Sequence, residues 1–419
     1  MPQLENGERI PTINANESLQ IINFIAEGGQ GEVYKVNYNG RTCALKWYKS
    51  QVPPDYFYEN LKRMVQRGAP NDNFLWPQML TNRYKDSYGY VMELRPSNYC
   101  EFGDFLLDKV RFKSYKTLID AALNIVGSFR ELHSMGYSYQ DVNEGGFFID
   151  PKTGAVLICD NDNVAEFGVN LGVKGMPRYM APEVVTNQTR PNTHTDRFSL
   201  AVLLFRLFYI DHPLEGKYTV QFPLTDAIGA QLYGVDPTFI YDPKKNKNRP
   251  DPEAHPNVIK RWKMYPPDLK ATFMKAFTKG MKDINNRVTE VEWEEALVKT
   301  RGMLVKIDGK EQFINAYAKQ KLPEGCQMMV LPDYVVVLTN DTEIYDCHVD
   351  QFSADYHKVA GVVKASLSDK TVLGLGNLSD KDWTVTSPSG DHNVITKGQY
   401  TRIAPGVKID FGGTTAEIY

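Results

Sequence analysis

The sequence predicts an α+β protein with three successive parts: a strand-rich lobe, a helix-rich lobe and a separate all-β sandwich. Three observations predict this order. Residues 20–50 alternate apolar and polar side chains around glycines, as strands in a meander do. From Leu118 to Gly136 apolar residues recur every three or four positions, as in an amphipathic helix, and helical segments continue to about residue 305. After residue 308 this periodicity ends, and short strand-like runs alternate with turns.

Composition sets the broad class of the protein. A chain of 419 residues is too long for one ordinary domain. Its 42% hydrophobic and 24% charged residues are typical of a soluble globular protein. The net charge of −3 gives no attraction for a polyanion, so we expect no nucleic-acid partner. Five scattered cysteines without a C-x-x-C pair favour neither a zinc site nor a disulfide framework.

No segment has the pattern of a membrane anchor. The first residues lack a basic flank followed by an apolar core, so we expect no signal peptide. The longest apolar run, Leu200–Ile210, is too short for a bilayer and is interrupted by Arg206. We therefore expect a cytoplasmic protein without membrane contact.

The first candidate site is the glycine-rich run "AEGGQGEVYKV", which reads as strand, turn and strand. Gly28, Gly29 and Gly31 would let backbone amides approach phosphate groups closely. Val33 would then cover a nucleobase. Many ordinary hairpins contain glycines, so this run is a weak signal without further residues.

A lysine on the next strand strengthens the signal. Lys46 follows Ala44 and Leu45, and a lysine in this place can neutralise phosphates if a carboxylate holds it. Glu59 is the only glutamate between Lys46 and Glu93, and it lies on the polar face of the following helix. The sequence therefore predicts a Lys46–Glu59 ion pair.

Two aspartates complete the constellation. Asp141 opens the tight loop "YQDVNEGGFFID", and Asp160 follows the apolar strand "AVLIC". One carboxylate could accept the proton of an incoming hydroxyl while the other binds Mg²⁺. Aspartates in turns are commonly only turn formers. Here, however, "GMPRYMAPEV", "TDRFSLAVLLF" and "NNRV" follow in a fixed order.

With these motifs in this order, residues 20–300 resemble a eukaryotic-type protein kinase domain. The resemblance implies a bilobal protein-kinase-like fold with lobes at 1–95 and 96–305, and it implies ATP with Mg²⁺ or Mn²⁺ as cofactors. Lys46 would bind the α- and β-phosphates with Glu59 as its partner, Asp141 would be the catalytic base, and Asp160 would bind metal. The nucleotide site would comprise Gly28, Gly29, Gly31, Val33, Ala44, Lys46, Glu59, Met92, Glu93, Leu94 and Phe148.

The same resemblance assigns three residues to architecture and points to a narrower group. Glu183 and Arg287 would form a structural ion pair, and Asp196 would brace the catalytic loop. The runs "FYENLKR", "SYQDVNEGGFFIDPKTG" and "LICDNDNVA" are similar to bacterial kinases of tellurite and stress-response operons. That similarity implies a protein substrate and, as partners, von Willebrand-type and phosphatase proteins.

One departure from the family pattern concerns regulation. Gln140 stands where an arginine would pair with a phosphate on the activation loop. Between Asn161 and Pro182 there is no Ser or Thr, and Tyr179 carries the only hydroxyl. We therefore expect activity that does not depend on Ser/Thr phosphorylation of this segment.

Other departures affect the chemistry. Gly146 replaces the metal-binding asparagine, and Asn143 replaces a lysine that contacts phosphate. Asp162, in "DND", either replaces the lost asparagine as a metal ligand or is an Asx-turn residue. Because Met176 stands where Ser/Thr kinases place a threonine, the phosphoacceptor stays open. An active protein kinase, expected to act on Ser or Thr, thus stands beside two alternatives: an ATP-binding pseudokinase scaffold, and a phosphotransferase with a non-protein acceptor.

The C-terminal part, residues 310–419, is predicted to be a separate β-sandwich. Gly374–Ile418 resembles the last strands of a forkhead-associated (FHA-like) module, a fold that reads phosphothreonine. Arg402 is the only arginine after Arg301 and falls in a late strand. His348 and His357 are expected to be structural, which favours a docking or regulatory module in which phosphate reading is absent or altered.

Overall fold

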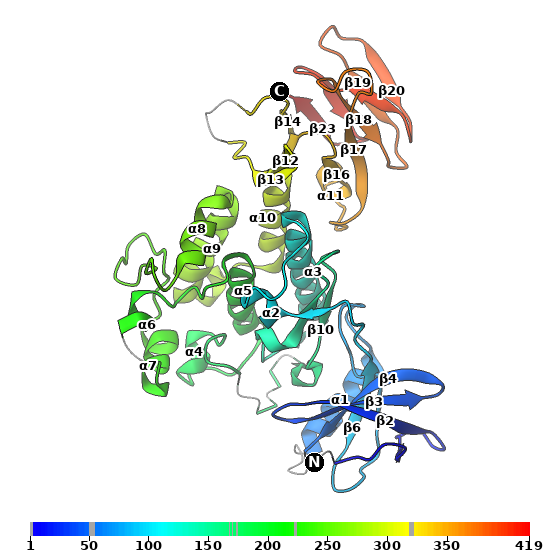
Figure 1. The fold of residues 1–419 in the computed structure, drawn as a ribbon, viewed down its shortest axis with the longest axis vertical. Coiled ribbons are helices and arrows are strands. Elements are labelled where there is room, and N and C mark those ends of the chain that lie inside the picture. Colours follow the sequence, from blue (N-terminus) through cyan, green and yellow to red (C-terminus); the bar gives the residue numbers. More distant parts are fainter. Residues whose placement is uncertain are drawn as a thin grey trace.

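The computed structural model describes residues 3–49, 55–166, 168–169, 171–172, 175–221, 224–317 and 322–419. Along its long axis a strand-rich lobe, a helical lobe and a β module follow one another in chain order (Figure 1). The predicted α+β class is therefore confirmed. Among the described residues no helix is long and apolar enough to cross a membrane.

The N-terminal lobe is one antiparallel sheet with a helix beside it. Its strands have the order β1-β2-β3-β4-β6-β5. Their bounds are β1 Arg9–Pro11, β2 Ser18–Glu27, β3 Gly31–Tyr38, β4 Arg41–Tyr48, β5 Met79–Leu80 and β6 Gly89–Glu93. The β3–β4 hairpin turns at Asn39 and Gly40, both with positive φ, as the two-residue type I′ turn requires.

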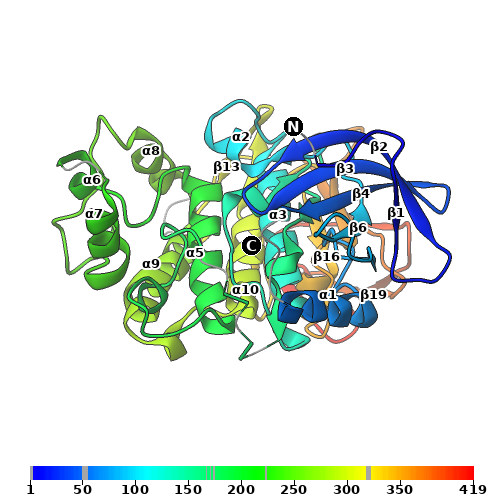
Figure 2. The same ribbon diagram turned by 90° about the horizontal axis from the view of Figure 1, so that it is seen from below.

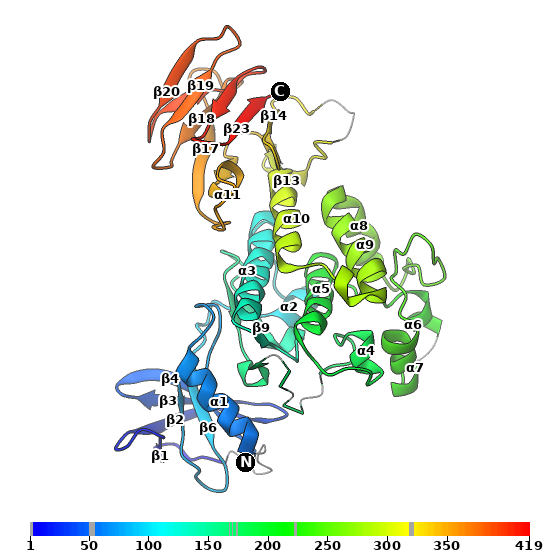
Figure 3. The ribbon, with the colours of Figure 1, turned by 180° about the vertical axis from the view of Figure 1, so that it is seen from behind.

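Helix α1 (Asp55–Arg67) runs alongside this sheet (Figures 2 and 3). It buries Phe57, Asn60, Leu61 and Met64, which recur at the three-to-four spacing of one helical face. Gly68 ends the helix with a φ of 81°, a left-handed value that glycine adopts without strain.

The second lobe is built around two long helices. Ser114 caps α3 (Tyr115–Ser134) and Asn192 caps α5 (Thr193–Tyr209), each through a capping box. Nearly all of α5 is buried, which explains its continuous apolar sequence. The other helices are α2 Phe102–Leu106, α4 Pro182–Val185, α6 Lys217–Gln221, α7 Asp226–Ala230, the π-helix η3 Gln231–Val235, α8 Pro256–Met264, α9 Pro267–Lys282, the 3₁₀-helix η4 Ile284–Asn286 and α10 Glu290–Gly302.

Short strands of this lobe fix two functional loops. β7 (Cys100–Glu101), β9 (Phe147–Ile149) and β10 (Val156–Ile158) form one small sheet, and β8 (Tyr137–Ser138) pairs with β11 (Ala165–Glu166). Residues 139–146 lie between β8 and β9, and residues 159–164 lie between β10 and β11. Each loop is thus held by a paired strand at both of its ends.

The C-terminal module follows α10 through the hairpin β12 (Leu304–Ile307) and β13 (Lys310–Phe313). Two sheets follow, ordered β15-β14-β23-β22-β19-β20 and β16-β17-β18-β21, and their inward residues form one apolar cluster. Gly361 has no side chain because a Cβ there would lie 2.7 Å from Trp383, which comes from the other sheet. The elements are β14 Gln327–Val330, β15 Val335–Leu338, β16 Glu343–Tyr345, α11 Asp346–Val349, β17 Val359–Ala365, β18 Leu373–Asn377, β19 Trp383–Thr386, β20 His392–Ile395, β21 Tyr400–Arg402, β22 Lys408–Asp410 and β23 Thr415–Ile418.

Arg301, near the end of α10, joins the module to the helical lobe. Its guanidinium donates to Asp120 of α3 at 2.9 Å and to the Tyr356 carbonyl at 2.6 Å, and it lies 3.6 Å from the Tyr345 ring centroid. Tyr345 and Cys347, both from the module, belong to the same apolar cluster as the core of the helical lobe. The junction is therefore a packed interface rather than a free linker.

We predict that Arg301→Ala lowers the free energy of unfolding of the whole chain by about 3 kcal/mol, because buried Asp120 then keeps only the partly exposed Lys116 as its cation. Denaturant unfolding followed by tryptophan fluorescence measures the change. The exposed lysine of the Lys364–Asp341 pair gives the control, and Lys364→Ala should leave the curve in place. An unaltered curve for Arg301→Ala would show that the junction contributes no stability.

Candidate active site

Lys46 on β4 reaches the loop after β10. Its Nζ lies 2.8 Å from Asp162 and 3.0 Å from Asp160, and its side chain is 9% exposed. Burial by itself would lower the pKa of Lys46, but the charges of Asp162 and Asp160 outweigh burial and raise it. Lys46 is therefore a fixed cation at the meeting point of the two lobes.

Asp162 is the buried centre of this network. Besides Lys46, the Tyr48 hydroxyl donates to its Oδ2 at 2.7 Å and the Tyr90 hydroxyl donates to its Oδ1 at 3.2 Å. The side chain of Asp162 is fully buried, whereas that of Asp160 is 48% exposed. Burial, followed by the charge of Asp162, raises the pKa of Tyr48. Tyr48 therefore stays protonated and keeps donating.

The predicted Lys46–Glu59 ion pair is not the pair that the structure forms. Glu59 binds Lys62 at 2.9 Å, and its side chain is 56% exposed. The inward position of α1 belongs to the next residue, Asn60, whose Nδ2 donates to the Val164 carbonyl at 2.8 Å. The physical reason is helical phase, because Glu59 falls outside the buried face of α1. Asp162 holds Lys46 in its place.

Asp141 lies in the loop after β8, where neighbouring groups orient it. Asn143 Nδ2 donates to its Oδ1 at 3.1 Å, and the Met176 backbone also bonds to the carboxylate. Burial raises the pKa of Asp141, and these hydrogen bonds oppose the rise. Asn143 also accepts from the Gly145 amide at 2.9 Å, so it shapes the loop as well as the carboxylate.

Gln140 connects the same loop to the segment after Asp160. Its Nε2 donates to the Val169 carbonyl at 2.6 Å. Asp196 accepts from the Tyr139 and Gln140 amides at 2.6 and 3.1 Å, which is the bracing role that the resemblance implied. Gln140 has a φ of 69°, a left-handed value that this clamp holds in place.

Tyr139 explains the glycine at position 146. The buried Tyr139 hydroxyl donates to the Cys159 carbonyl, and a Cβ on Gly146 would lie 2.8 Å from that hydroxyl. The phenol therefore fills the space beside position 146, where a metal-binding asparagine was expected. The loss of the asparagine and the presence of Tyr139 are one coupled change.

The segment that ends near Pro182 is also fixed by buried polar contacts. Glu183 and Arg287 form the implied ion pair at 2.7 Å. The Tyr179 hydroxyl contacts Arg206, which pairs with Glu144 at 2.9 Å. Because Tyr179 is buried, its hydroxyl is inaccessible to another enzyme.

The expected phosphate turn forms a β2–β3 hairpin. The Gly28 amide donates to the Gly31 carbonyl at 2.8 Å. A Cβ on Gly31 would lie 2.4 Å from the Trp47 carbonyl, so packing against β4 requires this glycine. Gly29 has open space around it, as a turn that must approach a ligand would need.

The residues expected to line a nucleobase pocket lie on the neighbouring strands β3, β4 and β6. Val33 pairs with Lys46, Ala44 pairs with buried Met92, and β6 ends at Glu93 before Leu94. Glu93 itself turns outward to Arg41 at 2.6 Å.

Arg95 is a site residue that the sequence reasoning missed. Its guanidinium lies 4.1 Å from the ring centroid of Phe148, the expected pocket floor, and it donates to the Tyr99 carbonyl. A planar cation is thus stacked where a nucleobase would approach Phe148. The only sequence signal was an arginine directly after Glu93 and Leu94, two of the residues expected at the nucleotide site.

These residues fit ATP with one divalent cation. Lys46 can neutralise phosphates, and the half-exposed carboxylate of Asp160 is a suitable Mg²⁺ ligand. Both oxygens of Asp162 already accept hydrogen bonds, and Gly146 has no ligand atom in its side chain. Because the side chain of Asp162 is also fully buried, a metal could reach it only if the surrounding network opened.

Comparisons with known proteins give matches to protein kinases. The protein-family model described as "Protein kinase domain" matches residues 19–246. Protein kinase YegI of Escherichia coli O157:H7 is 30% identical over 306 residues, which are 67% of this chain and 45% of that protein. RGS domain-containing serine/threonine-protein kinase A of Dictyostelium discoideum is 26% identical over 196 residues, 45% of this chain and 17% of that protein. The chain thus spans less than half the length of these curated relatives.

Among solved structures, the kinase domain of Mycobacterium tuberculosis PknI aligns with a TM-score of 0.48 and 16% identity, covering 71% of this chain and 99% of that one.

We predict that Asp162→Asn weakens ATP binding about tenfold, because the amide oxygen can still accept from Lys46 but the charge that holds the lysine in place is removed. Glu59→Gln is the matched control and should leave ATP affinity unchanged, since Glu59 contacts Lys62 instead. Calorimetric titration with ATP measures both variants. If Glu59→Gln weakened ATP binding more than Asp162→Asn did, Glu59 and not Asp162 would be the partner of Lys46.

Proposed function

Because the chain belongs to the protein kinase family, we propose that it transfers the γ-phosphate of ATP to a protein hydroxyl, that of Ser or Thr, with Mg²⁺ or Mn²⁺. The observation that carries the proposal is Asp141, a partly buried carboxylate oriented by Asn143 and the Met176 backbone. A scaffold that only bound nucleotide would need no oriented proton acceptor.

The residues divide the chemistry as follows. Bound ATP supplies the phosphoryl group and the ADP leaving group. As the acceptor oxygen bonds to the γ-phosphorus and the bond to ADP breaks, Asp141 takes the proton of the acceptor hydroxyl. Lys46 places its charge at the phosphates, and Asn143 keeps one Asp141 oxygen oriented. The raised pKa of Asp141 makes its carboxylate a stronger proton acceptor than an ordinary aspartate.

We also propose that no activation-loop phosphate is needed. The Gln140–Val169 bond provides a permanent link where a phosphorylated side chain would otherwise be required. The one hydroxyl of the segment, on Tyr179, is buried against Arg206. Protein freed of phosphate by phosphatase treatment should therefore be fully active.

A second candidate function is a nucleotide-binding pseudokinase scaffold. The observation that favours it is the Tyr139 hydroxyl beside Gly146, which removes one metal ligand and blocks a larger side chain. Loss of one electrostatic donor lowers a rate by on the order of 10²-fold and need not abolish it. A phosphotransferase with a non-protein acceptor is supported only by Met176 at the position of the family's threonine.

For the C-terminal module we propose a docking or regulatory role, with phosphate reading absent or altered. Buried His348 has its pKa lowered to about 3 by burial, so it stays neutral and cannot grip phosphate as a cation. FHA-like readers grip phosphate with a Ser-x-x-His run, and this chain has one at Ser389–His392, but there Ser389 donates to Asp391 at 2.6 Å in the β19–β20 turn. That aspartate would repel phosphate. Partner proteins of von Willebrand or phosphatase type, in a bacterial cytoplasm, remain part of this proposal.

We predict that the wild-type chain transfers labelled γ-phosphate to a generic protein substrate, and that Asp141→Asn lowers turnover 10²- to 10⁴-fold while ATP stays bound. Transfer with Mg²⁺ and with Mn²⁺ is measured beside ATP titration of the same samples. Wild-type turnover equal to that of Asp141→Asn, with ATP bound to both, would establish the scaffold instead.

The same assay can probe the coupled pair. Gly146→Asn alone should damage the loop because its Cβ would meet the Tyr139 hydroxyl at 2.8 Å. Tyr139→His combined with Gly146→Asn removes that hydroxyl and makes room for the amide. The double variant should therefore exceed the single variant in turnover.

The pH profile of kcat/KM should fall as pH decreases through the raised pKa of Asp141, because the protonated acid cannot accept the hydroxyl proton. Asn143→Ala removes a hydrogen bond that favours the carboxylate, so the pKa rises further and the acid limb moves to higher pH. Asn340→Ala, in the C-terminal module, is the control and should leave the limb in place. A shift to lower pH in Asn143→Ala would contradict this assignment.

A further inference from the structure

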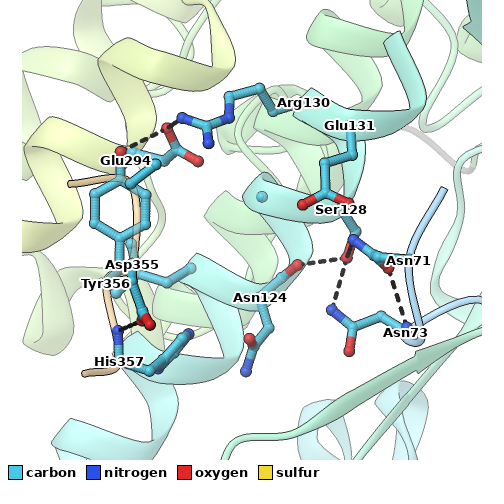
Figure 4. A pocket seen from close by; sticks show the side chains of 13 residues that line it. Asn71, Asn73, Asn124, Ser128, Arg130, Glu131, Glu294, Asp355, Tyr356 and His357 are labelled. Carbon is cyan, nitrogen blue, oxygen red and sulfur yellow. Dashed lines mark hydrogen bonds and ion pairs between the residues drawn. The ribbon is translucent and has the colours of Figure 1, made fainter. Parts of the chain in front are cut away.

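A cavity of about 310 Å³ lies where three parts of the chain meet, apart from the candidate active site (Figure 4). Its walls come from α3, from the loop that precedes β5, from Glu294 of α10, and from the module segment 354–357. Its volume is at the lower end of the range for small-molecule sites. The lining residues are Asn71, Asn73, Leu123, Asn124, Gly127, Ser128, Arg130, Glu131, Glu294, Ala354, Asp355, Tyr356 and His357.

In the cavity wall, carboxylate groups outnumber positively charged groups. Three carboxylates, those of Glu131, Glu294 and Asp355, face one guanidinium, that of Arg130, which is already paired with Glu294 at 2.8 Å. Burial lowers the pKa of His357, so it adds no positive charge near neutral pH.

The amide side of the cavity is organised without a ligand. The Asn73 backbone amide donates to Asn71 Oδ1 at 3.0 Å, and Asn73 Nδ2 donates to Ser128 Oγ at 2.9 Å. Ser128 in turn donates to the Asn124 carbonyl at 2.7 Å. This wall is therefore preformed, and an occupant would not have to order it.

Glu294 is the group in this cavity whose hydrogen bonding is incomplete. Its side chain is 1% exposed. Its Oε2 accepts from Arg130 and, at 2.9 Å, from the Tyr356 hydroxyl. Its Oε1 has no hydrogen-bond partner among the residues that the structure describes. A buried carboxylate oxygen without a hydrogen-bond donor is energetically unfavourable. A donor from a bound ligand would therefore stabilise it.

Gly127 lies beside this buried oxygen. It lines the cavity, and a Cβ there would lie 3.8 Å from Glu294 Oε1. That distance is an ordinary van der Waals contact, so an alanine would fit, and its methyl group would narrow the space that a donor to this oxygen must enter. Glycine within a helix costs about 1 kcal/mol relative to alanine, so Gly127→Ala should not destabilise the helix.

We propose that this cavity binds a small amine of about the size of an amino sugar, whose ammonium donates to Glu294 Oε1. An ammonium has three donors and no acceptor, which matches a wall of acceptors with an excess of carboxylates. Hydroxyl groups on the same ligand would find the amides of Asn73 and Asn124 opposite.

The cavity is connected to the candidate active site by backbone hydrogen bonds. The Ile158 amide donates to the Asn73 carbonyl at 2.7 Å, and the Leu75 amide donates to the Ile158 carbonyl at 2.8 Å. Ile158 is the last residue of β10, and Asp160 follows two residues later. An occupant would therefore touch the wall that anchors the Asp160 strand and, through Tyr356, the module.

The test is calorimetric and thermal-shift titration of the full-length chain with glucosamine, and with glucose as the matched probe without the amine. Glucosamine should raise the melting temperature and bind at least tenfold more tightly than glucose. Glu294→Gln should weaken glucosamine binding at least tenfold, whereas Glu295→Gln, an exposed neighbour on α10, should leave it unchanged.

Gly127→Ala keeps the test decisive if Glu294→Gln folds poorly. This variant should be at least as stable as the wild type and should bind glucosamine more weakly. Equal binding of glucose and glucosamine, no binding of glucosamine, or unchanged binding in both Glu294→Gln and Gly127→Ala would each overturn the proposal. None of these readouts uses phosphoryl transfer, so they stand or fall independently of the kinase assignment.

Discussion

The buried ion pair between Lys46 and Asp162 is the interaction on which the site depends. Lys46 lies on a strand of the N-terminal sheet, and Asp162 follows a strand of the helical lobe, 116 residues later. A buried carboxylate without its cation would destabilise the chain by several kcal/mol, so the two lobes must meet at this point for either charge to be tolerated. Tyr48 and Tyr90 occupy further acceptor capacity of Asp162, and Asp160 shares the lysine while keeping one side open to solvent. Lys46 and Asp160, the proposed phosphate and metal ligands, are therefore placed by a contact that needs no ligand.

Around this pair the unusual residues come in matched sets rather than singly. Gly146 is small because the Tyr139 hydroxyl occupies the adjacent space. Gln140 replaces a charge-dependent link with a direct bond to the Val169 carbonyl. Asp162 forms the ion pair with Lys46, whereas Glu59 pairs with Lys62. Several atypical residues thus occur together with a carboxylate at Asp141 that Asn143 and the Met176 backbone orient.

The sequence was sufficient for features that depend on local spacing or on strong motif order. The strand meander at residues 20–50, the helix predicted from Leu118 and the Asp196 brace follow from such patterns and are confirmed. The prediction for Glu59 was wrong because a shift of one residue changes which side chain of a helix points inward. In α1 that position belongs to the neighbouring Asn60. The Asp162 network and the stacking of Arg95 on Phe148 join residues far apart in sequence, and no local periodicity encodes such contacts. The cavity at Glu294 was unforeseeable for the same reason, because four separate segments form it.

The junction at Arg301 has a consequence for how this protein can be divided. Because Tyr345 and Cys347 complete the apolar cluster of the helical lobe, the β module supplies part of the wall of its neighbour's core. A fragment cut after α10 would expose the matching surface of α3 and α10 to water, and Arg301 would lose the Tyr356 carbonyl and the Tyr345 ring. The helical lobe and the β module are therefore one packed unit rather than two independent domains. A chimaera with a different module in this place would also need the matching surface residues of α3 and α10.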